Sequence, residues 1–394
     1  MATKYVSPNG SNSNGDGTKS NPYENWEPTY PYGSQIDPVS DGDTVIFLEG
    51  DGSAIVLDEA NRSGYYDVNN LTFKAEPGEA PTLTTTGSGT DSSGDGALHF
   101  NGSSTGMTIT GLEIDGALGP GITSGDSVGL GTGGSITDCN IHHCGGSGIH
   151  LRSTGSGGVV RYVESWMNFG PDANDTGSTI GGDADGIGAG GANNPYYNDL
   201  LVEHCALHHN SDDGVDAIAS DGLTFRNNLV WGNGMQADGS RFPEGDTIPS
   251  STGIKLGYDD DVAKNIECYD NVSWGNGGPG IYNRSDGGGY EIYNNTCIYN
   301  GQKSGRAGYV NPGHSFHLNS GNSDTSFYDN IGNQSGSELS AVTGQTNSWQ
   351  VAASDVQDSW FVDTAVGTAF NRVTGEFLRL ASGSPMIDAG QSVS

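Results

Sequence analysis

Short alternations of apolar and polar residues recur along the middle of the chain, and a turn rich in asparagine or glycine follows each. One column of this pattern comprises Asn168, Asn210, Asn233, Asn276, Asn300 and Asn333, with Cys144 in the equivalent place of an earlier segment. Counted from Cys144, successive members lie 24, 42, 23, 43, 24 and 33 residues apart. The base period is therefore 23 to 24 residues, with insertions in some repeats. Short β-rich segments at such a period predict a solenoid of stacked coils.

A second column of apolar residues follows the first by a few positions. It comprises Ile149, Ile187, Val215, Ile254, Ile281 and Phe316. Because side chains alternate between the two faces of a strand, these residues should form an interior stack, and their neighbours should point outward. The Leu-x-x-Leu-x-Leu signature of leucine-rich repeats is absent. We therefore predict an all-β fold, a parallel β-helix, with an internal asparagine ladder at turns that tolerate the left-handed conformation.

The pattern runs without a visible linker, so we predict a single domain over residues 1–394. A cap and first coil should occupy about 1–50, and a closing segment about 375–394. Insertions at about 169–185, 234–251 and 302–314 should form loops that flank the face where substrate sits. The start at Met1 resembles a mature N-terminus behind an initiator methionine, and no run of 18 apolar residues is present.

Composition narrows the classes of function. The net charge of −33 disfavours nucleic-acid binding, which needs clusters of Lys and Arg, and agrees with solubility in a salty medium. The 65 glycines in 394 residues fit a chain of many turns. The five cysteines are odd in number and lack a CxxC pair, so we expect buried free thiols.

Carboxylates concentrate at one place in the repeat. Asp212, Asp213 and Asp216 fall within five residues, and the alignment of the repeats places Asp185 beside Asp213 and Asp216 beside Lys255. Stacked like charges repel, and a hard cation relieves that repulsion. Ca²⁺ accepts six to eight oxygen ligands in irregular geometry, and no Cys/His set with zinc spacing accompanies these residues. The sequence therefore predicts a Ca²⁺ site, with a solvated acidic patch as the alternative.

Lys255 lies one coil from this cluster and has two possible roles. It can be a salt-bridge partner of the carboxylates. It can also be a general base, if desolvation beside bound Ca²⁺ lowers its pKa enough for a neutral fraction at alkaline pH. Such a base could take the C5 proton of a uronic acid whose carboxylate binds Ca²⁺. Loss of the C4 oxygen would then give a 4,5-unsaturated product.

Three segments carry a family resemblance: 184–187 (ADGI), 210–216 (NSDDGVD) and 253–257 (GIKLG). Together they resemble the motifs of the pectate lyases of polysaccharide lyase family nine. The resemblance implies a right-handed parallel β-helix, a catalytic Ca²⁺ held by Asp185, Asp212, Asp213 and Asp216, and Lys255 as the Brønsted base. Two positions depart from the expected pattern: Val215, where a bulky aromatic residue is expected, and Gly188, which is small where the next coil has Asp216.

Two residues one coil beyond Lys255 are candidates for substrate binding. Tyr282 stands in the Lys255 column, and Arg284 follows on the same outward face. The Arg284 guanidinium could hold a substrate carboxylate with two hydrogen bonds. Arg152 occupies the same column nearer the N-terminus, and we interpret it as a surface residue.

The sequence thus predicts a secreted, Ca²⁺-dependent lyase that acts as a monomer on an acidic polysaccharide, first of all polygalacturonate, with no nucleic-acid or membrane partner. Three alternatives stay open: a lyase of another uronic-acid glycan such as rhamnogalacturonan, a glycan-binding shaft like a phage tailspike, and a β-helix glycoside hydrolase. The hydrolase would need two or three carboxylates at hydrolytic separation and no essential lysine or metal.

Overall fold

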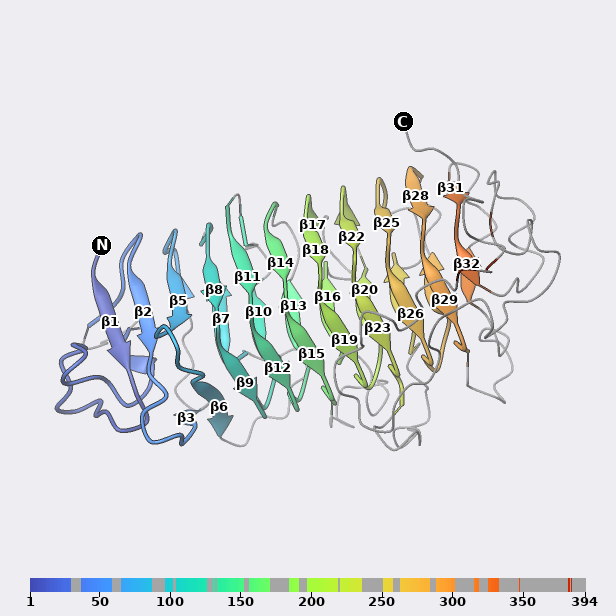
Figure 1. Ribbon diagram of the computed structural model, residues 1–394. Helices are drawn as coiled ribbons and strands as arrows, with labels where there is room; N and C mark the ends of the chain where they lie inside the picture. The colour runs from blue at the N-terminus through green and yellow to red at the C-terminus, as the bar shows by residue number, and fades with distance from the viewer. Residues whose placement is uncertain are drawn as a thin grey trace, which may run out of the picture.

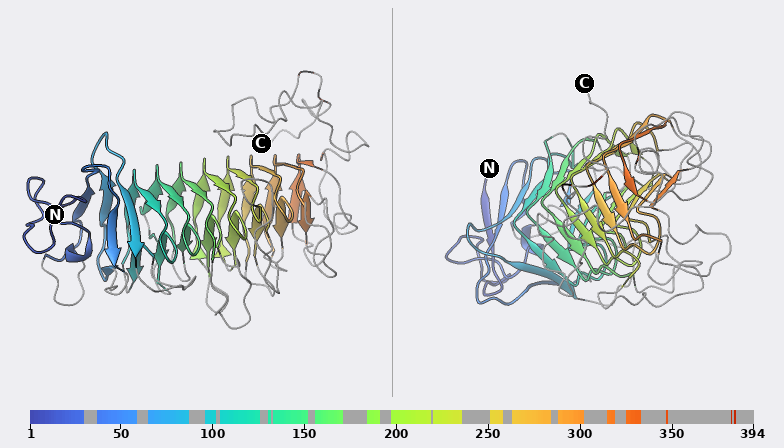
Figure 2. Two further views of the ribbon diagram at one scale, coloured as in Figure 1. Left: turned by 90° about the horizontal axis from the view of Figure 1, so that it is seen from below. Right: turned by 45° about the vertical axis from the view of Figure 1, so that its right-hand side comes forward.

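The computed structural model describes most of the chain up to residue 332. The described residues are 1–29, 37–58, 65–86, 96–101, 104–125, 130–131, 133–151, 156–170, 184–190, 197–218, 220–235, 251–257, 263–283, 288–301, 315–318, 325–332, 347, 382 and 384. Within them the structure is almost entirely β, with one short 3₁₀ helix, η1 (Glu27–Thr29). Successive coils stack side by side from the N-terminal end to β31 and β32 (Figures 1 and 2).

Three long parallel sheets run along the stack, and each coil from β2 to β30 contributes one short strand to each. The eleven-stranded sheet contains β1 (Thr3–Val6), β2 (Thr44–Phe47), β5 (Thr72–Ala75), β8 (Thr108–Thr110), β11 (Ser135–Thr137), β14 (Val159–Arg161), β18 (Leu201–Glu203), β22 (Thr224–Arg226), β25 (Glu267–Tyr269), β28 (Tyr290–Tyr293) and β31 (Thr325–Tyr328).

The ten-stranded sheet contains β3 (Ile55–Asp58), β6 (Thr82–Thr86), β9 (Glu113–Asp115), β12 (Asn140–His142), β15 (Glu164–Trp166), β19 (Ala206–His208), β23 (Leu229–Trp231), β26 (Val272–Trp274), β29 (Thr296–Ile298) and β32 (Ile331–Gly332). The nine-stranded sheet contains β4 (Tyr65–Tyr66), β7 (Leu98–Asn101), β10 (Ile122–Ser124), β13 (Ile149–Leu151), β16 (Ile187–Ala189), β20 (Val215–Ala217), β24 (Ile254–Leu256), β27 (Ile281–Asn283) and β30 (Phe316–Leu318). A small extra pair joins β17 (Tyr197–Asn198) to β21 (Ser220–Asp221). This arrangement confirms the predicted right-handed parallel β-helix.

The interior of the solenoid is an apolar stack, as the alternation of residues predicts. All six members of the second column are fully buried: Ile149, Ile187, Val215, Ile254, Ile281 and Phe316. They belong to one continuous hydrophobic core that runs from Val6 to Phe327. Because the inward positions of the nine-stranded sheet are fixed by this burial, the residues between them must face outward.

The predicted asparagine ladder is present, and a second ladder accompanies it. In the first, Asn168, Asn210, Asn233, Asn276 and Asn300 bond one another in sequence between the ten- and nine-stranded sheets. In the second, Asn228, Asn271, Asn295, Asn330 and Asn347 do the same between the eleven- and ten-stranded sheets. Each ladder begins at the backbone N–H of a cysteine, Cys144 in the first and Cys205 in the second. Asn333, assigned to the first ladder by its spacing, lies outside the described residues.

In the described turns of both ladders, the left-handed residue stands one position before the asparagine. In the first ladder these residues include Met167 (φ 51°) and His209 (φ 54°), and in the second Asp270 (φ 56°) and Asn294 (φ 53°). The left-handed conformation expected at these turns is therefore present, and it belongs to the residue before the ladder asparagine. The preceding residue makes the turn, which leaves the asparagine side chain inside the coil to bond its counterparts.

Removal of one ladder asparagine should destabilise the fold strongly. Asn233 donates from Nδ2 to Asn276 Oδ1 (2.9 Å) and to the Leu207 carbonyl (3.3 Å), and it accepts from Asn210 N (3.2 Å) and Nδ2 (3.0 Å). Asn233→Ala leaves these buried donors and acceptors unsatisfied, so we expect a loss of about 3 kcal/mol in the free energy of unfolding. Urea unfolding measures it, with the exposed Asn14→Ala as the matched control. Equal midpoints for the two variants would contradict a stabilising ladder.

Other expectations on the fold have mixed outcomes. All five cysteines are buried and free, as predicted, and burial raises the pKa of the Cys139, Cys144 and Cys205 thiols to about 12. At the N-terminal end, β1 pairs in parallel with β2, which joins the start of the chain to the first coil. The insertions and the closing segment lie largely outside the described residues. The described part of the chain contains no helix with the length and apolar character needed to cross a lipid bilayer.

Candidate functional site

A column of outward-facing side chains crosses the nine-stranded sheet at its middle position. The strand register pairs Gly188 of β16 with Asp216 of β20, Asp216 with Lys255 of β24, and Lys255 with Tyr282 of β27. This is the stacking expected from the repeat. Since the residues on either side of each member are buried, the column is fixed on the outer face of the sheet, where Asp216 and Lys255 are themselves buried.

Lys255 contacts two carboxylates. Its Nζ donates to Asp216 Oδ2 at 2.6 Å and to Asp213 Oδ2 at 3.2 Å. The side chain of Lys255 is only 5% exposed, and those of Asp213 and Asp216 are 0% and 6% exposed. The contacts are thus a buried ion-pair cluster, in which loss of one partner is costly, and not a surface salt bridge of little effect.

Backbone N–H groups from neighbouring coils orient the carboxylates. Thr252 N donates to Asp213 Oδ1 at 2.5 Å, and Ser251 N donates to Asp212 Oδ1 at 3.1 Å. Asp213 N in turn donates to Asp185 Oδ1 at 3.0 Å. Sequence analysis missed the contribution of residues 251 and 252, because a backbone donor leaves no signal in the side-chain pattern.

Ser147 orients the carboxylate of Asp185, and it too was not predicted as a site residue. Its Oγ donates to Asp185 Oδ2 at 3.3 Å and accepts from Asp185 N at 3.1 Å. Gly188 lies next to this pair. A Cβ atom at 188 would lie 3.5 Å from Asp185 Oδ2 and 3.4 Å from the His150 ring. The glycine, noted as a departure from the family pattern, therefore packs beside Asp185, which is buried at 5% exposure.

The four carboxylates around Lys255 outnumber its single ammonium group. Burial, and then the carboxylates of Asp216, Asp212 and Asp213, raise the pKa of Asp185 well above its ordinary value. Burial lowers the pKa of Lys255, but Asp216, Asp213 and Asp212 outweigh it and raise the pKa well above its ordinary value. Without a cation, the cluster thus holds Lys255 in its protonated form, whereas sequence analysis expected a lowered pKa beside bound Ca²⁺.

The donor set fits a hard divalent cation. One oxygen from each of Asp185, Asp213 and Asp216 lies within 4.8 Å of the others, and all three residues are buried. Asp212, the fourth predicted ligand, is 7% exposed but does not belong to this converging group; its Oδ1 accepts from Ser251 N. Carboxylate oxygens are the ligands that Ca²⁺ prefers, and one ammonium cannot neutralise four carboxylates.

The two candidates for substrate binding differ in what the structure describes. Tyr282 is half-buried, and its ring centre lies 4.5 Å from that of His317 in an edge-to-face contact. His317 continues the column in β30, and His150 precedes Gly188 in β13. Arg284 and Arg152 lie outside the described residues. The part of the column described beyond Lys255 is therefore aromatic.

Comparison with known proteins places this geometry in context. A family model described as "Pel9A-like, right handed beta helix region" matches residues 4–322. The chain is 25% identical to pectate lyase L of Dickeya dadantii (strain 3937) over 196 residues, which are 48% of this chain and 41% of that protein. The chain thus covers less than half the length of that relative.

Two solved structures share the fold over nearly the whole chain. Pectate lyase Pel9A superposes with a TM-score of 0.69 at 19% identity, covering 100% of this chain and 92% of that one. A rhamnogalacturonan lyase superposes with a TM-score of 0.61 at 15% identity, covering 97% of each chain. At this level of identity both similarities concern the fold alone.

Proposed function

Because the chain belongs to the Pel9A-like right-handed β-helix family, we propose that it is a Ca²⁺-dependent lyase of polysaccharide lyase family nine. In this proposal it cleaves an acidic polysaccharide, polygalacturonate first, by β-elimination. The observation that carries the proposal is the position of the Lys255 amine, which lies in an outward column within 3.2 Å of two buried carboxylates. A glycan-binding shaft has no need of such an amine, and a glycoside hydrolase would use carboxylates alone.

Lys255 acts as the base. Its neutral amine takes the C5 proton of the uronic acid, and the electron pair of the C5–H bond forms the C4=C5 double bond. The C4–O bond breaks, its electrons leave with the oxygen of the departing sugar, and that oxygen takes up a proton from solvent. Asp216 and Asp213 fix the position of Nζ, which limits the motion needed to reach the proton. The proton then passes from Lys255 to solvent.

Asp185, Asp212, Asp213 and Asp216 would hold the Ca²⁺. When bound, the cation would attract the uronate carboxylate and offset part of the negative field that keeps Lys255 protonated. The buried ion pairs with Asp213 and Asp216 have the opposite effect: they raise the pKa of Lys255, because they favour the charged ammonium. We therefore expect a base that is active only at alkaline pH, where its neutral fraction is appreciable.

A lyase of a rhamnogalacturonan-type glycan is the second candidate. It is supported by the fold shared with the rhamnogalacturonan lyase, at a TM-score of 0.61. Both polymers present a uronic acid to the same base. We further propose that the protein is secreted and monomeric, which agrees with a strongly acidic chain that must stay soluble.

One assay tests elimination against the alternatives. The protein is mixed with polygalacturonate, and separately with rhamnogalacturonan, in Ca²⁺ at alkaline pH, and ultraviolet absorbance is followed. Only elimination creates a C=C bond conjugated to the carboxylate. New reducing ends without absorbance would indicate a hydrolase, and binding without cleavage would indicate an adhesin. The relative rates on the two polymers assign the substrate.

A further inference from the structure

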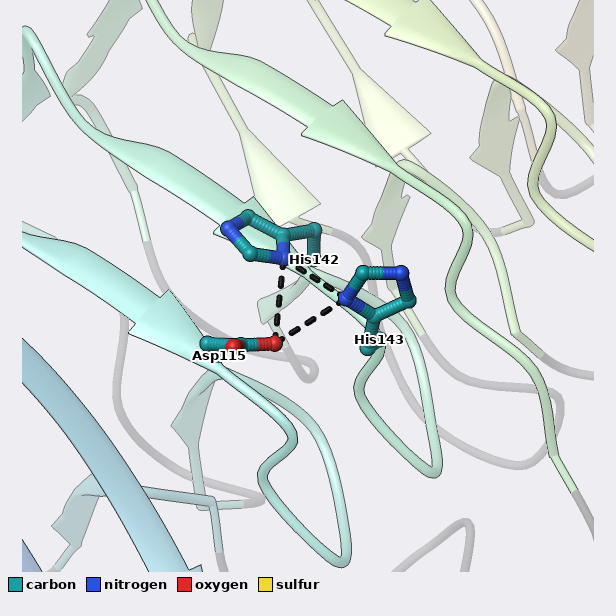
Figure 3. A group of neighbouring side chains, drawn as sticks. All are labelled: Asp115, His142 and His143. Atoms are coloured by element: carbon teal, nitrogen blue, oxygen red, sulfur yellow. Dashed lines mark hydrogen bonds and ion pairs between the residues drawn. The ribbon is translucent and has the colours of Figure 1, made fainter. Parts of the chain in front are cut away.

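A second cluster of polar side chains lies on the ten-stranded sheet, away from the Lys255 column. Asp115 ends β9, His142 ends β12, and His143 forms the turn that follows, with φ 55°. Figure 3 shows the carboxylate and the two rings meeting at one point. The two Nδ1 atoms are 2.8 Å apart, and they lie 3.1 Å (His142) and 3.0 Å (His143) from Asp115 Oδ1.

A neighbouring carboxylate sets the tautomer of His142. Its Nε2 lies 3.0 Å from Glu113 Oε1, and a carboxylate only accepts, so Nε2 carries the proton. In the neutral ring Nδ1 then has a lone pair, which faces Asp115 and His143. Ligating histidines commonly donate their other N–H to a carboxylate in this way.

Asp115 Oδ1 and the Nδ1 atoms of His142 and His143 carry too few protons for a hydrogen bond at each of their three contacts. With His142 Nδ1 unprotonated and Asp115 Oδ1 an acceptor, His143 Nδ1–H is the one donor that neutral rings supply. It can serve one contact well, and the 3.1 Å contact between His142 Nδ1 and Asp115 Oδ1 then joins two acceptors. A cation between these atoms removes the conflict.

The dimensions suit a small divalent ion. Zinc binds imidazole nitrogen and carboxylate oxygen at ~2.0–2.2 Å, which separates tetrahedral ligands by about 3.3 Å. The observed separations of 2.8 to 3.1 Å need shifts of only a few tenths of an ångström. Stacking on Trp166, at 4.5 Å between ring centres and 24° between planes, fixes the His142 ring. Asp115 and His143 are 47% and 49% exposed, so an ion and a water ligand can enter.

We propose that Asp115, His142 and His143 form a site for Zn²⁺ or a similar borderline divalent ion, with Glu113 positioning His142. Imidazole nitrogen is a poor ligand for Ca²⁺ and a good one for Zn²⁺. This site therefore differs in chemistry from the carboxylate cluster around Lys255. The ion joins two successive coils, because His142 and Asp115 are register partners on adjacent strands. It therefore clamps this part of the solenoid.

The repeat contains a natural comparison. His208 and His209 have the same Nδ1 separation of 2.8 Å, and His208 Nε2 lies 3.1 Å from Glu164 Oε1. On the preceding strand, the register partner of His208 is Trp166, whereas the register partner of His142 is Asp115. The second pair thus repeats the histidines and the positioning carboxylate without the third ligand. The proposal makes Asp115 the residue that turns the pair into a site.

Zinc titration of the intact, tag-free protein tests the site. The protein is freed of metal by chelation and returned to millimolar Ca²⁺, which competes with Zn²⁺ for the acidic cluster. Zn²⁺ affinity is then measured by competition with a chromophoric indicator. We expect one Zn²⁺ per chain, bound at least ~10-fold more weakly in Asp115→Asn and in His143→Ala, since even outer-shell changes cost that much. Zn²⁺ should also raise the thermal unfolding midpoint of the wild type and of neither variant.

The matched controls are the exposed Asp138→Asn and His204→Ala, which should bind Zn²⁺ like the wild type. Equal affinity in all four variants, or no binding by the wild type, would overturn the proposal; the latter would mean that a proton on His142 holds the cluster together. One equivalent of Cu²⁺ gives an independent readout on the wild type. Two-nitrogen coupling in its electron paramagnetic resonance spectrum supports the site, and an oxygen-only spectrum contradicts it.

Discussion

Lys255→Ala is expected to lower kcat on polygalacturonate by about 10³-fold or more while KM changes little, because general-base catalysis contributes roughly 10²–10⁴-fold. As the proposed base, the residue would act on the proton and not on the resting substrate, so binding should survive. The alanine also leaves Asp213 and Asp216 buried without their ammonium, so some loss of stability should accompany it. Circular dichroism at the assay temperature separates this effect from the loss of chemistry.

Lys255→Arg distinguishes a base from a charge partner. Arginine keeps the positive charge between the carboxylates but stays protonated, with a pKa above about 12, so it should be almost as inactive as alanine. Because the carboxylates raise the pKa of Lys255, the wild-type rate should climb with pH through the alkaline range. Lys264→Ala, which removes a 44% exposed lysine, is the control. An arginine variant with most of the wild-type activity would show that Lys255 is only an ion-pair partner.

The fold could be predicted from the sequence because successive coils repeat the same pattern of buried apolar residues and turn asparagines. The apolar column from Ile149 to Phe316 marks the core, and the first asparagine ladder marks the turns. The second ladder was missed, although Asn228 and Asn271 follow the same rule. Its asparagines stand after Asn227 and Asp270, and in a chain rich in asparagine and aspartate such pairs look like ordinary turn residues.

The residues of the candidate site could be predicted from the sequence, but the direction of the Lys255 pKa shift could not. The column alignment brings Asp216 beside Lys255, as the register shows. The sign of the Lys255 pKa shift depends on contacts of 2.6 and 3.2 Å competing with burial, and a column alignment gives no distances. The Asp115 cluster was not predicted either, because its three residues lie on two coils and lack a familiar zinc spacing.

Asp213→Asn is expected to abolish Ca²⁺-dependent activity. The asparagine keeps Oδ1 as an acceptor for Thr252 N, so the local backbone should hold, whereas Asp213→Ala would leave that buried N–H unsatisfied. Loss of one of the converging carboxylates removes both charge and a ligand atom from the proposed Ca²⁺ site. Lyase activity should fall to background in the variant, as it should in the wild type with excess chelator.

Calorimetric Ca²⁺ titration and the thermal unfolding midpoint provide readouts that do not depend on activity. Ca²⁺ should raise the midpoint of the wild type, because a ligand that binds only the folded state stabilises it. Here it also relieves the repulsion that, after burial, raises the Asp185 pKa. It should raise the midpoint of the exposed-residue control Asp199→Asn equally, and that of Asp213→Asn much less. Full activity in excess chelator would remove Ca²⁺ from the mechanism. An unchanged Ca²⁺ effect on Asp213→Asn would place the ion elsewhere and leave the carboxylates as partners of Lys255 alone.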